Sequence, residues 1–263
     1  MLAEDRARAV QLLADQRIAA RALEGLPAAL RPHDETTAYA LQDSVVARLE
    51  HAGLGPVIGF KIGATSAAMQ SYLGIDHPCC GLVLAADRHP SPARLPRSSF
   101  LNPGLELEIA VRLGTAIGPG DGPFTAASVA PAVAAAMTSI EIVDARWRDF
   151  RAVDTPSLIA DGFFHAALVL GPEAPVPPGG LADLEGVMTI DGREIGRDRG
   201  AAILGDPFEA LAWLARHRAA HGQGLPAGTI VTLGSLIPPA WLDGPCEAVV
   251  TVEALGEARV AVA

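Results

Sequence analysis

Two glutamates at alternate positions of an apolar segment carry the clearest chemical signal in the sequence. Glu106 and Glu108 lie within residues 105–113, where polar and apolar side chains alternate. Side chains two residues apart in a β-strand share a face, so both carboxylates would project together. Carboxylates this close repel one another, a cost that a divalent cation with oxygen ligands removes. Alone, such a pair is more often the solvent-facing edge of an amphipathic strand.

A third acid changes this balance. Glu141 lies between Ile140 and Ile142 in a second apolar run, residues 138–143. A single acid in such a run is either an edge residue or a buried functional group, because burying it unpaired is costly. If the two runs form neighbouring strands, three carboxylates converge. Three carboxylates with water suit octahedral Mg²⁺ or Mn²⁺, so we expect a metal site there.

The only lysine of the chain is a second candidate. Lys and Arg together number 20, and Lys61 is the single lysine among them. Lysine is a compact charge whose pKa shifts readily, whereas arginine is a bulky permanent cation. A lone lysine in an arginine-biased chain indicates a position where arginine could not replace it. The alternative is that the lysine occurs there by chance.

Composition limits the classes of function. The formal net charge of -10 disfavours a broad nucleic-acid or acidic-membrane surface. No apolar run reaches the roughly 18 residues that a membrane helix needs, and the N-terminus does not resemble a signal peptide. The adjacent Cys79 and Cys80 lack the partner pair of a zinc site, and three cysteines make no disulfide framework. We expect a cytoplasmic protein with a small anionic substrate.

The elements that must position these residues can be predicted in outline. Apolar spacing predicts two helices in the first fifty residues, the second capped by Asp34. A short helix over 66–73 and an Ala-rich helix over 126–137 are also expected, and Asp191-Gly192 predicts a hairpin. Many strands and few long helices favour an α+β fold with a mixed β-roll. We expect an N-terminal helical arm (residues 1–53) on one catalytic domain (residues 54–263).

Several blocks of the sequence resemble a known family in their order along the chain. They are GFKIGATSAAMQSYLGIDHP, PGLELEIAVRL, EIVDARWRDF, ADGFFHAALVLG, AAILGDPFEALAWLA and GTIVTLGSL. Together they resemble the 2-oxopent-4-enoate hydratase and 4-oxalocrotonate decarboxylase branch of the fumarylacetoacetate hydrolase superfamily. The resemblance implies the β-roll fold, homo-oligomers, a role in aromatic compound catabolism, and Mg²⁺ or Mn²⁺ on Glu106, Glu108 and Glu141. It places the family's lysine at Lys61.

The activity that the resemblance implies is addition of water to a 2-hydroxy-2,4-dienoate, giving a 4-hydroxy-2-oxo acid. The metal would chelate the substrate and stabilise enolate-like charge, and Lys61 would pair with the carboxylate or transfer a proton. Alternatives are decarboxylation of a 2-oxo acid, carbon–carbon hydrolysis, or an altered member with another substrate. Association with a related decarboxylase is a further alternative to a homo-oligomer alone.

The chain departs from the family pattern at three places. Cys79 stands where the hydratases have an acid/base aspartate, Gly162 and the residues after it replace an amide and a hydroxyl, and Leu233 replaces a threonine. These changes predict a more apolar pocket. The predicted catalytic residues are Lys61, Cys79 and Ser235, and the predicted substrate-binding residues are Leu233, Asp161 and Arg146.

Overall fold

Two long antiparallel strands form the centre of the computed structural model, which describes residues 1–263. These strands, β5 (Pro103–Leu113) and β6 (Val133–Asp144), pair over nearly their whole length. They belong to a large sheet with the strand order β2-β1-β10-β5-β6-β7-β3, and β11 also pairs with β5. The other strands of this sheet are β1 (Val57–Gly63), β2 (Cys79–Leu84), β3 (Arg88–Pro90), β7 (His165–Leu170), β10 (Ile230–Ser235) and β11 (Ala240–Trp241).

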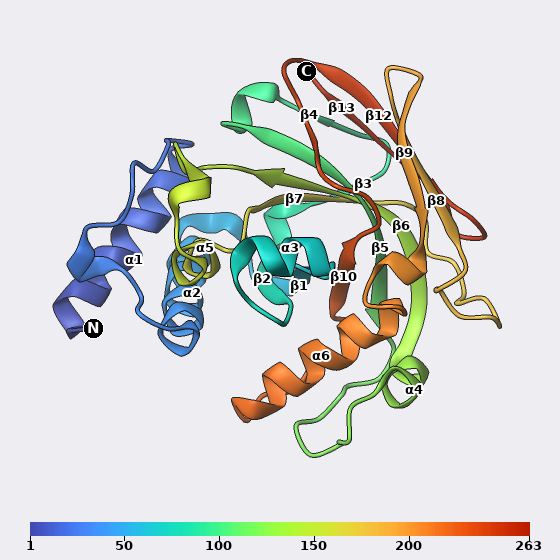
Figure 1. Cartoon of the computed structure of the whole chain (residues 1–263), viewed down its shortest axis with the longest axis horizontal. Coiled ribbons are helices and arrows are strands. Elements are labelled where there is room, and N and C mark those ends of the chain that lie inside the picture. Colours follow the sequence, from blue (N-terminus) through green and yellow to red (C-terminus); the bar gives the residue numbers. More distant parts are fainter.

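A second sheet packs on one face of the first (Figure 1). Its strand order is β4-β13-β12-β8-β9. The strands are β4 (Ala93–Leu95), β8 (Glu185–Ile190), β9 (Arg193–Arg199), β12 (Cys246–Val252) and β13 (Gly256–Val262). Alternation within β5 sends Leu105, Leu107 and Ile109 into the main apolar core and leaves the glutamates on the opposite face. On that face the large sheet curls until β2 contacts β7. The predicted α+β mixed β-roll is confirmed.

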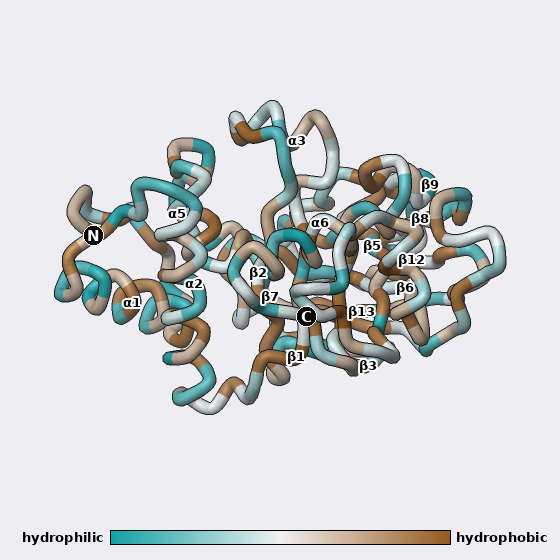
Figure 2. The backbone as a smooth tube through the Cα atoms, turned by 90° about the horizontal axis from the view of Figure 1, so that it is seen from below, coloured by the Kyte–Doolittle hydropathy of each residue, from teal (hydrophilic) through white to brown (hydrophobic).

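The helices are unevenly placed, as Figures 1 and 2 show. Helices α1 (Ala3–Ile18), α2 (Glu35–Leu49) and α5 (Thr155–Ala160) gather at one end of the molecule, and α6 (Pro207–Ala220) packs against β10. The two remaining helices are α3 (Ala67–Leu73) and α4 (Ala126–Val129). No helix is both long and apolar enough to cross a membrane. The apolar core runs continuously from α1 and α2 into the roll, and the division at residue 53 stays a prediction.

Local signals in the sequence account for several boundaries. Asp34 accepts a hydrogen bond from Thr37 N at 2.7 Å, which confirms the predicted cap of α2. Helix α3 ends at Gly74 in the left-handed conformation, as a C-terminal glycine favours. Asp191 and Gly192 both have positive φ and join β8 to β9, so the predicted hairpin is confirmed.

The prediction of a helix over residues 126–137 is wrong beyond its first turns. Helix α4 ends at Val129, a 3₁₀ turn covers Ala130–Ala132, and β6 begins at Val133. Pro131 within this segment lacks the backbone N–H that a continuing helix needs. Of the alanines that follow, Ala135 pairs with Arg112 and Ala136 with Val111 of β5, so tertiary pairing overrides their helix propensity.

Gly59 generates a prediction for the strand that carries Lys61. A Cβ at Gly59 would lie 2.0 Å from the Ile230 carbonyl oxygen on the paired strand β10. Gly59→Ala should therefore destabilise the protein by about 3 kcal/mol, because overpacking forces the two strands apart. Urea unfolding measures this, with Gly120→Ala as the matched control since a Cβ there meets nothing within 4 Å. Equal stabilities of the two variants would contradict the close approach.

Candidate active site

The three glutamates meet on the concave face of the curled sheet. Glu106 and Glu141 are directly opposite one another in the β5–β6 ladder, and Glu108 is one step further along β5. One carboxylate oxygen from each residue lies within 4.8 Å of the others. The pairing of β5 with β6, which the sequence left conditional, thus brings the three acids together.

Two of these carboxylates are fully buried without enough hydrogen-bond donors, and Glu106 is half-buried. Glu108 and Glu141 are 0% exposed, and neither oxygen of Glu108 nor Oε2 of Glu141 has a hydrogen-bond partner. Burial and the neighbouring Glu141 raise the pKa of Glu106 to about 8, and burial raises the pKa of Glu108 well above its usual range. Such a cluster is costly in a protein core unless a cation compensates it.

Glu141 differs from the other two because cationic and donor groups surround it. Burial alone would raise its pKa, but Lys61 and a hydrogen bond from His165 hold the pKa below the usual value. Lys61 Nζ lies 3.4 Å from Glu141 Oε1, and His165 Nδ1 lies 2.8 Å from the same oxygen. With Glu141 ionised, Nδ1 of His165 must be the donor. The histidine fixes the orientation of this carboxylate.

A chain of buried charges continues from His165 to the N-terminal helices. His165 Nε2 lies 3.7 Å from Asp87 Oδ2, and Arg17 of α1 lies 3.3 Å from that oxygen. Burial lowers the pKa of Arg17, with Arg146 nearby adding to that effect. The sequence analysis missed Arg17 and Asp87, which no local pattern distinguishes.

A cavity of about 470 Å³ opens beside the carboxylates. Glu106, Lys61 and Ser235 line it, and most of its remaining wall is apolar. Ser235 Oγ donates to the Ile237 carbonyl oxygen at 2.7 Å, which leaves its lone pairs available as acceptors. Gly234, with φ of +112°, lets Thr65 approach so closely that a Cβ would lie 2.4 Å from the Thr65 hydroxyl. Of the six residues predicted to act on the substrate, Lys61 and Ser235 line the cavity.

The other four predicted residues lie outside the cavity wall. Leu233 is 0% exposed within the main apolar core. Arg146 and Asp161 form a buried ion pair at 3.1 Å, and Arg146 also donates to the Asp161 and His165 carbonyl oxygens. This pair is occupied in joining the segments that flank the site, so neither side chain is free to hold a substrate.

Cys79 is enclosed at the start of β2. It is 0% exposed, and burial raises the pKa of its thiol above the usual value. A neutral, enclosed thiol is a poor acid/base group. The structure thus provides no contact through which Cys79 would meet a molecule in the cavity.

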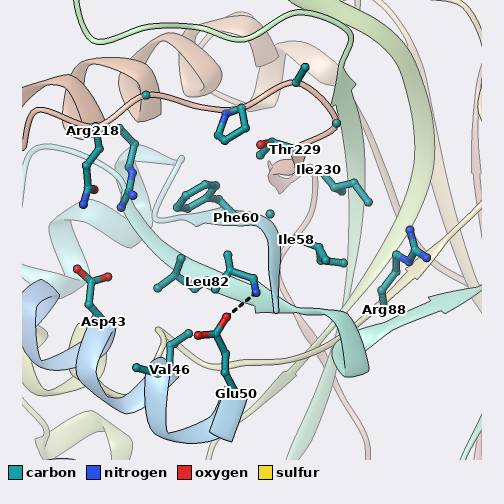
Figure 3. Close-up of a pocket in the computed structure, with 18 residues that line it drawn as sticks. Asp43, Val46, Glu50, Ile58, Phe60, Leu82, Arg88, Arg218, Thr229 and Ile230 are labelled. Atoms are coloured by element: carbon teal, nitrogen blue, oxygen red, sulfur yellow. Dashed lines mark hydrogen bonds between the residues drawn. The ribbon is translucent and has the colours of Figure 1, made fainter. Parts of the chain in front are cut away.

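A second and larger hollow, of about 820 Å³, lies at the other end of β1 (Figure 3). Its charged groups include Asp43, Glu50, Arg88 and Arg218. Glu50 is occupied by the Val57 backbone N–H at 3.0 Å, the bond drawn in Figure 3. No group of carboxylates converges on this hollow. The smaller cavity, beside the three glutamates, is therefore the better candidate for the active site.

Comparison with known proteins places this arrangement in context. The model of the fumarylacetoacetate (FAA) hydrolase C-terminal family matches residues 80–263. A protein of Burkholderia vietnamiensis named 2-keto-4-pentenoate hydratase is 35% identical over 233 residues, which cover 86% of this chain and 85% of that protein. A 4-oxalocrotonate decarboxylase of Pseudomonas putida is 30% identical over 208 residues, or 76% of this chain and 74% of that protein.

A solved structure shares the fold over the whole chain. The 4-oxalocrotonate decarboxylase from Pseudomonas putida G7, complexed with magnesium and adipate, superposes with a TM-score of 0.93 and covers 100% of this chain and 99% of that one. Its sequence identity is 23%, so this comparison shows likeness of fold. The matched family model spans most of the chain, including every strand from β3 onwards. On these grounds the chain belongs to the fumarylacetoacetate hydrolase family.

Proposed function

We propose that this protein is a divalent-metal-dependent hydro-lyase that adds water to 2-hydroxy-2,4-dienoates and yields 4-hydroxy-2-oxo acids. The observation that carries the proposal is the convergence of three carboxylates, two of them fully buried, beside a cavity that Glu106 and the single lysine line. The relative at 35% identity, named for hydration of a 2-keto-4-pentenoate, supports this choice of reaction. Such a reaction fits the breakdown of aromatic compounds.

The residues present fit Mg²⁺ or Mn²⁺. Glu106, Glu108 and Glu141 offer hard oxygen donors only, and three of their buried oxygens lack any partner. These glutamates would hold the cation, with coordination positions left for water and substrate. When bound, the metal supplies Lewis-acid stabilisation of negative charge on the substrate's carboxylate and 2-oxygen.

Lys61 is suited to act as a cation rather than as a base. Burial alone would lower its pKa, but Glu141, Glu106 and Glu108 together raise the pKa above the usual value. In the metal-free site the ammonium group therefore stays protonated at neutral pH, at the edge of the cavity. It can pair with the substrate's carboxylate or donate a proton to a carbon of the dienol.

Ser235 and the apolar wall would control water. The Ser235 hydroxyl already donates to Ile237, so its free lone pairs can accept a hydrogen bond from the water that is added. The apolar lining keeps bulk solvent from the reacting dienol, where stray protonation would end the reaction early.

A second candidate is decarboxylation of a 2-oxo acid. The relative from Pseudomonas putida at 30% identity is named 4-oxalocrotonate decarboxylase. Both reactions pass through the same dienol chemistry. We rank hydration first because the relative named for it is more similar and covers more of the chain. Carbon dioxide release from 4-oxalocrotonate measures the second activity directly.

The substrate is a small organic acid. We further propose that the chain forms homo-oligomers, alone or with a related decarboxylase, and acts in the cytoplasm. Family likeness supports the assembly, and three unpaired cysteines fit a reducing compartment. Light scattering with and without the partner tests the assembly.

The activity prediction concerns the three glutamates. With Mg²⁺ or Mn²⁺, the wild type should remove the absorbance of 2-hydroxypenta-2,4-dienoate and form 4-hydroxy-2-oxopentanoate. Glu106→Gln, Glu108→Gln and Glu141→Gln should each lower kcat/KM at least about 100-fold, because a lost ligand removes several kcal/mol of charge stabilisation. Glu173→Gln, at an exposed salt bridge with Arg112, is the control. Full activity in all three variants would refute the proposed function.

Cation binding should also be visible in thermal stability. Mn²⁺ should raise the Tm of the wild type, because a cation bound only by the folded state stabilises it. Glu106 holds a proton in the folded state between pH 4.5 and about 8, so metal-free stability falls as pH rises through that range. The rise in Tm should therefore be larger at pH 8 than at pH 6. Glu108→Gln should melt like the metal-free wild type and lose the response to Mn²⁺, and a retained response would contradict the ligand assignment.

For Cys79, in contrast to the glutamates, we predict that substitution leaves the activity nearly unchanged. Cys79→Ser should keep kcat/KM within about threefold of wild type, since the thiol is enclosed and does not line the cavity. The measurement is the same dienol assay, after circular dichroism has shown that the variant is folded. A loss comparable with that of the glutamate variants would restore Cys79 as a catalytic residue.

A further inference from the structure

Four aromatic rings form a continuous wall from the mouth of the cavity to Lys61. The Trp241 ring stacks on Phe150 at 5.9 Å between centroids, and Phe150 meets Phe164 edge-on at 5.6 Å. Phe164 meets Phe163 edge-on at 5.7 Å, and Lys61 Nζ lies 5.2 Å from the Phe163 centroid. All four rings line the same cavity as Glu106. Edge-to-face and offset contacts of this kind favour a further aromatic ring.

The two inner rings are held by an unusual backbone. Gly162, Phe163 and Phe164 are consecutive residues with φ of 82°, 50° and 69°. Non-glycine residues in this region are strained, and such strain persists only where the surroundings fix it. The Phe163 N–H donates to the Leu158 carbonyl oxygen, and the Phe164 carbonyl oxygen accepts from Asp144 N, each at 2.8 Å. These two hydrogen bonds hold the backbone from which both rings project into the cavity.

The charges of the cavity disfavour an anion at its outer end. Lys61 is the only cation in the lining, and it is already paired with Glu141, while Asp198 adds a further acid. Arg151, whose guanidinium lies 5.0 Å from the Phe150 centroid, lines a neighbouring hollow that shares Phe150 with the cavity, but it does not line the cavity itself. A second carboxylate on the substrate would therefore be desolvated without a partner, which is costly.

The cavity is larger than the smallest substrate of the proposed reaction requires. A five-carbon 2-oxo acid has about eight non-hydrogen atoms, and at roughly 30 Å³ each, the share of a water molecule in the liquid, it fills about 240 Å³. The cavity measures about 470 Å³. The difference leaves room for an additional ring.

We propose that the cavity selects monocarboxylate 2-hydroxy-2,4-dienoates that carry a bulky, uncharged apolar group at the far end, an aryl group above all. The inference rests on the proposed function, since the polar end of the substrate is taken to meet Glu106 and Lys61. The aromatic wall then binds the far end, and the lack of a free cation excludes dicarboxylates. Phe150, Phe164 and Trp241 are the residues that determine this specificity.

Binding of unreactive analogues tests the selectivity without any turnover. Titration calorimetry with Mg²⁺ compares 2-oxopentanoate, 2-oxo-5-phenylpentanoate and the dicarboxylate 2-oxohexanedioate. The phenyl compound should bind at least about tenfold more tightly than 2-oxopentanoate, in line with added apolar contact in a pocket. The dicarboxylate should bind more weakly than either. Equal affinities, or the tightest binding by the dicarboxylate, would overturn the inference.

Turnover separates this inference from the proposed function. The ratio of kcat/KM for 2-hydroxy-5-phenylpenta-2,4-dienoate to that for 2-hydroxypenta-2,4-dienoate should be about ten or more, and 2-hydroxymuconate should be a poor substrate. Turnover of the unsubstituted dienoate without an aryl preference refutes the inference alone. Aryl-selective binding without turnover of any dienoate refutes the proposed function alone.

Variants of the aromatic wall test which residues cause the preference for aryl substrates. Phe164→Ser and Trp241→Ala should each lower the aryl preference about tenfold in both binding and turnover. Trp241 is 42% exposed, so its removal tests the wall even if Phe164→Ser folds poorly. Phe124→Ala removes a ring that does not line the cavity and should keep the wild-type ratio. An unchanged ratio in Trp241→Ala, or a lowered one in Phe124→Ala, would contradict the assignment of the wall.

Discussion

The gathering of three carboxylates, two of them fully buried, beside one ammonium group is the constraint on which the rest of the structure depends. Lys61 lowers the pKa of Glu141, while burial and the charge of Glu141 raise the pKa values of Glu106 and Glu108. A core cannot hold this arrangement by apolar packing, since each unpartnered oxygen costs free energy. The β5–β6 register, the His165 hydrogen bond and the curl of the sheet all fix the geometry of the cluster. The free energy that the glutamate cluster costs is offset by the large apolar core on the opposite face of the sheet.

Neighbouring residues restrict the space around the Lys61 side chain as well as its charge. A Cβ at Gly81 would lie 3.2 Å from the Lys61 side chain, and one at Gly63 would lie 3.3 Å from Nζ. Both glycines are on the strands β1 and β2 that flank the stem of the lysine, where the longer, planar guanidinium of arginine would find no room. The position of the single lysine in an arginine-rich chain therefore has a steric explanation as well as an electrostatic one.

How far the sequence predicts the site depends on how local each signal is. The alternation of Glu106 and Glu108 and the apolar setting of Glu141 are readable within short runs, as are the cap at Asp34 and the turn at Asp191-Gly192. The predictions fail where tertiary packing determines the structure of a segment or the direction of a side chain. The alanines after Pro131 enter a strand, and Leu233 points into the core because its neighbour Thr232 occupies the other face. Partners such as Arg17 and Asp87, 70 residues apart, leave no pattern that a single sequence reveals.

The contact of Arg17 with Asp87 connects the first helix to the cluster of three glutamates. Asp87 lies between that arginine and His165, and His165 orients a carboxylate of the cluster. Should the three glutamates hold the proposed cation, docking of α1 and binding of the cation would be coupled through these contacts, and such coupling is reciprocal. A change that loosens the helix would then weaken cation binding, and loss of the cation would destabilise the docked helix by the same free energy.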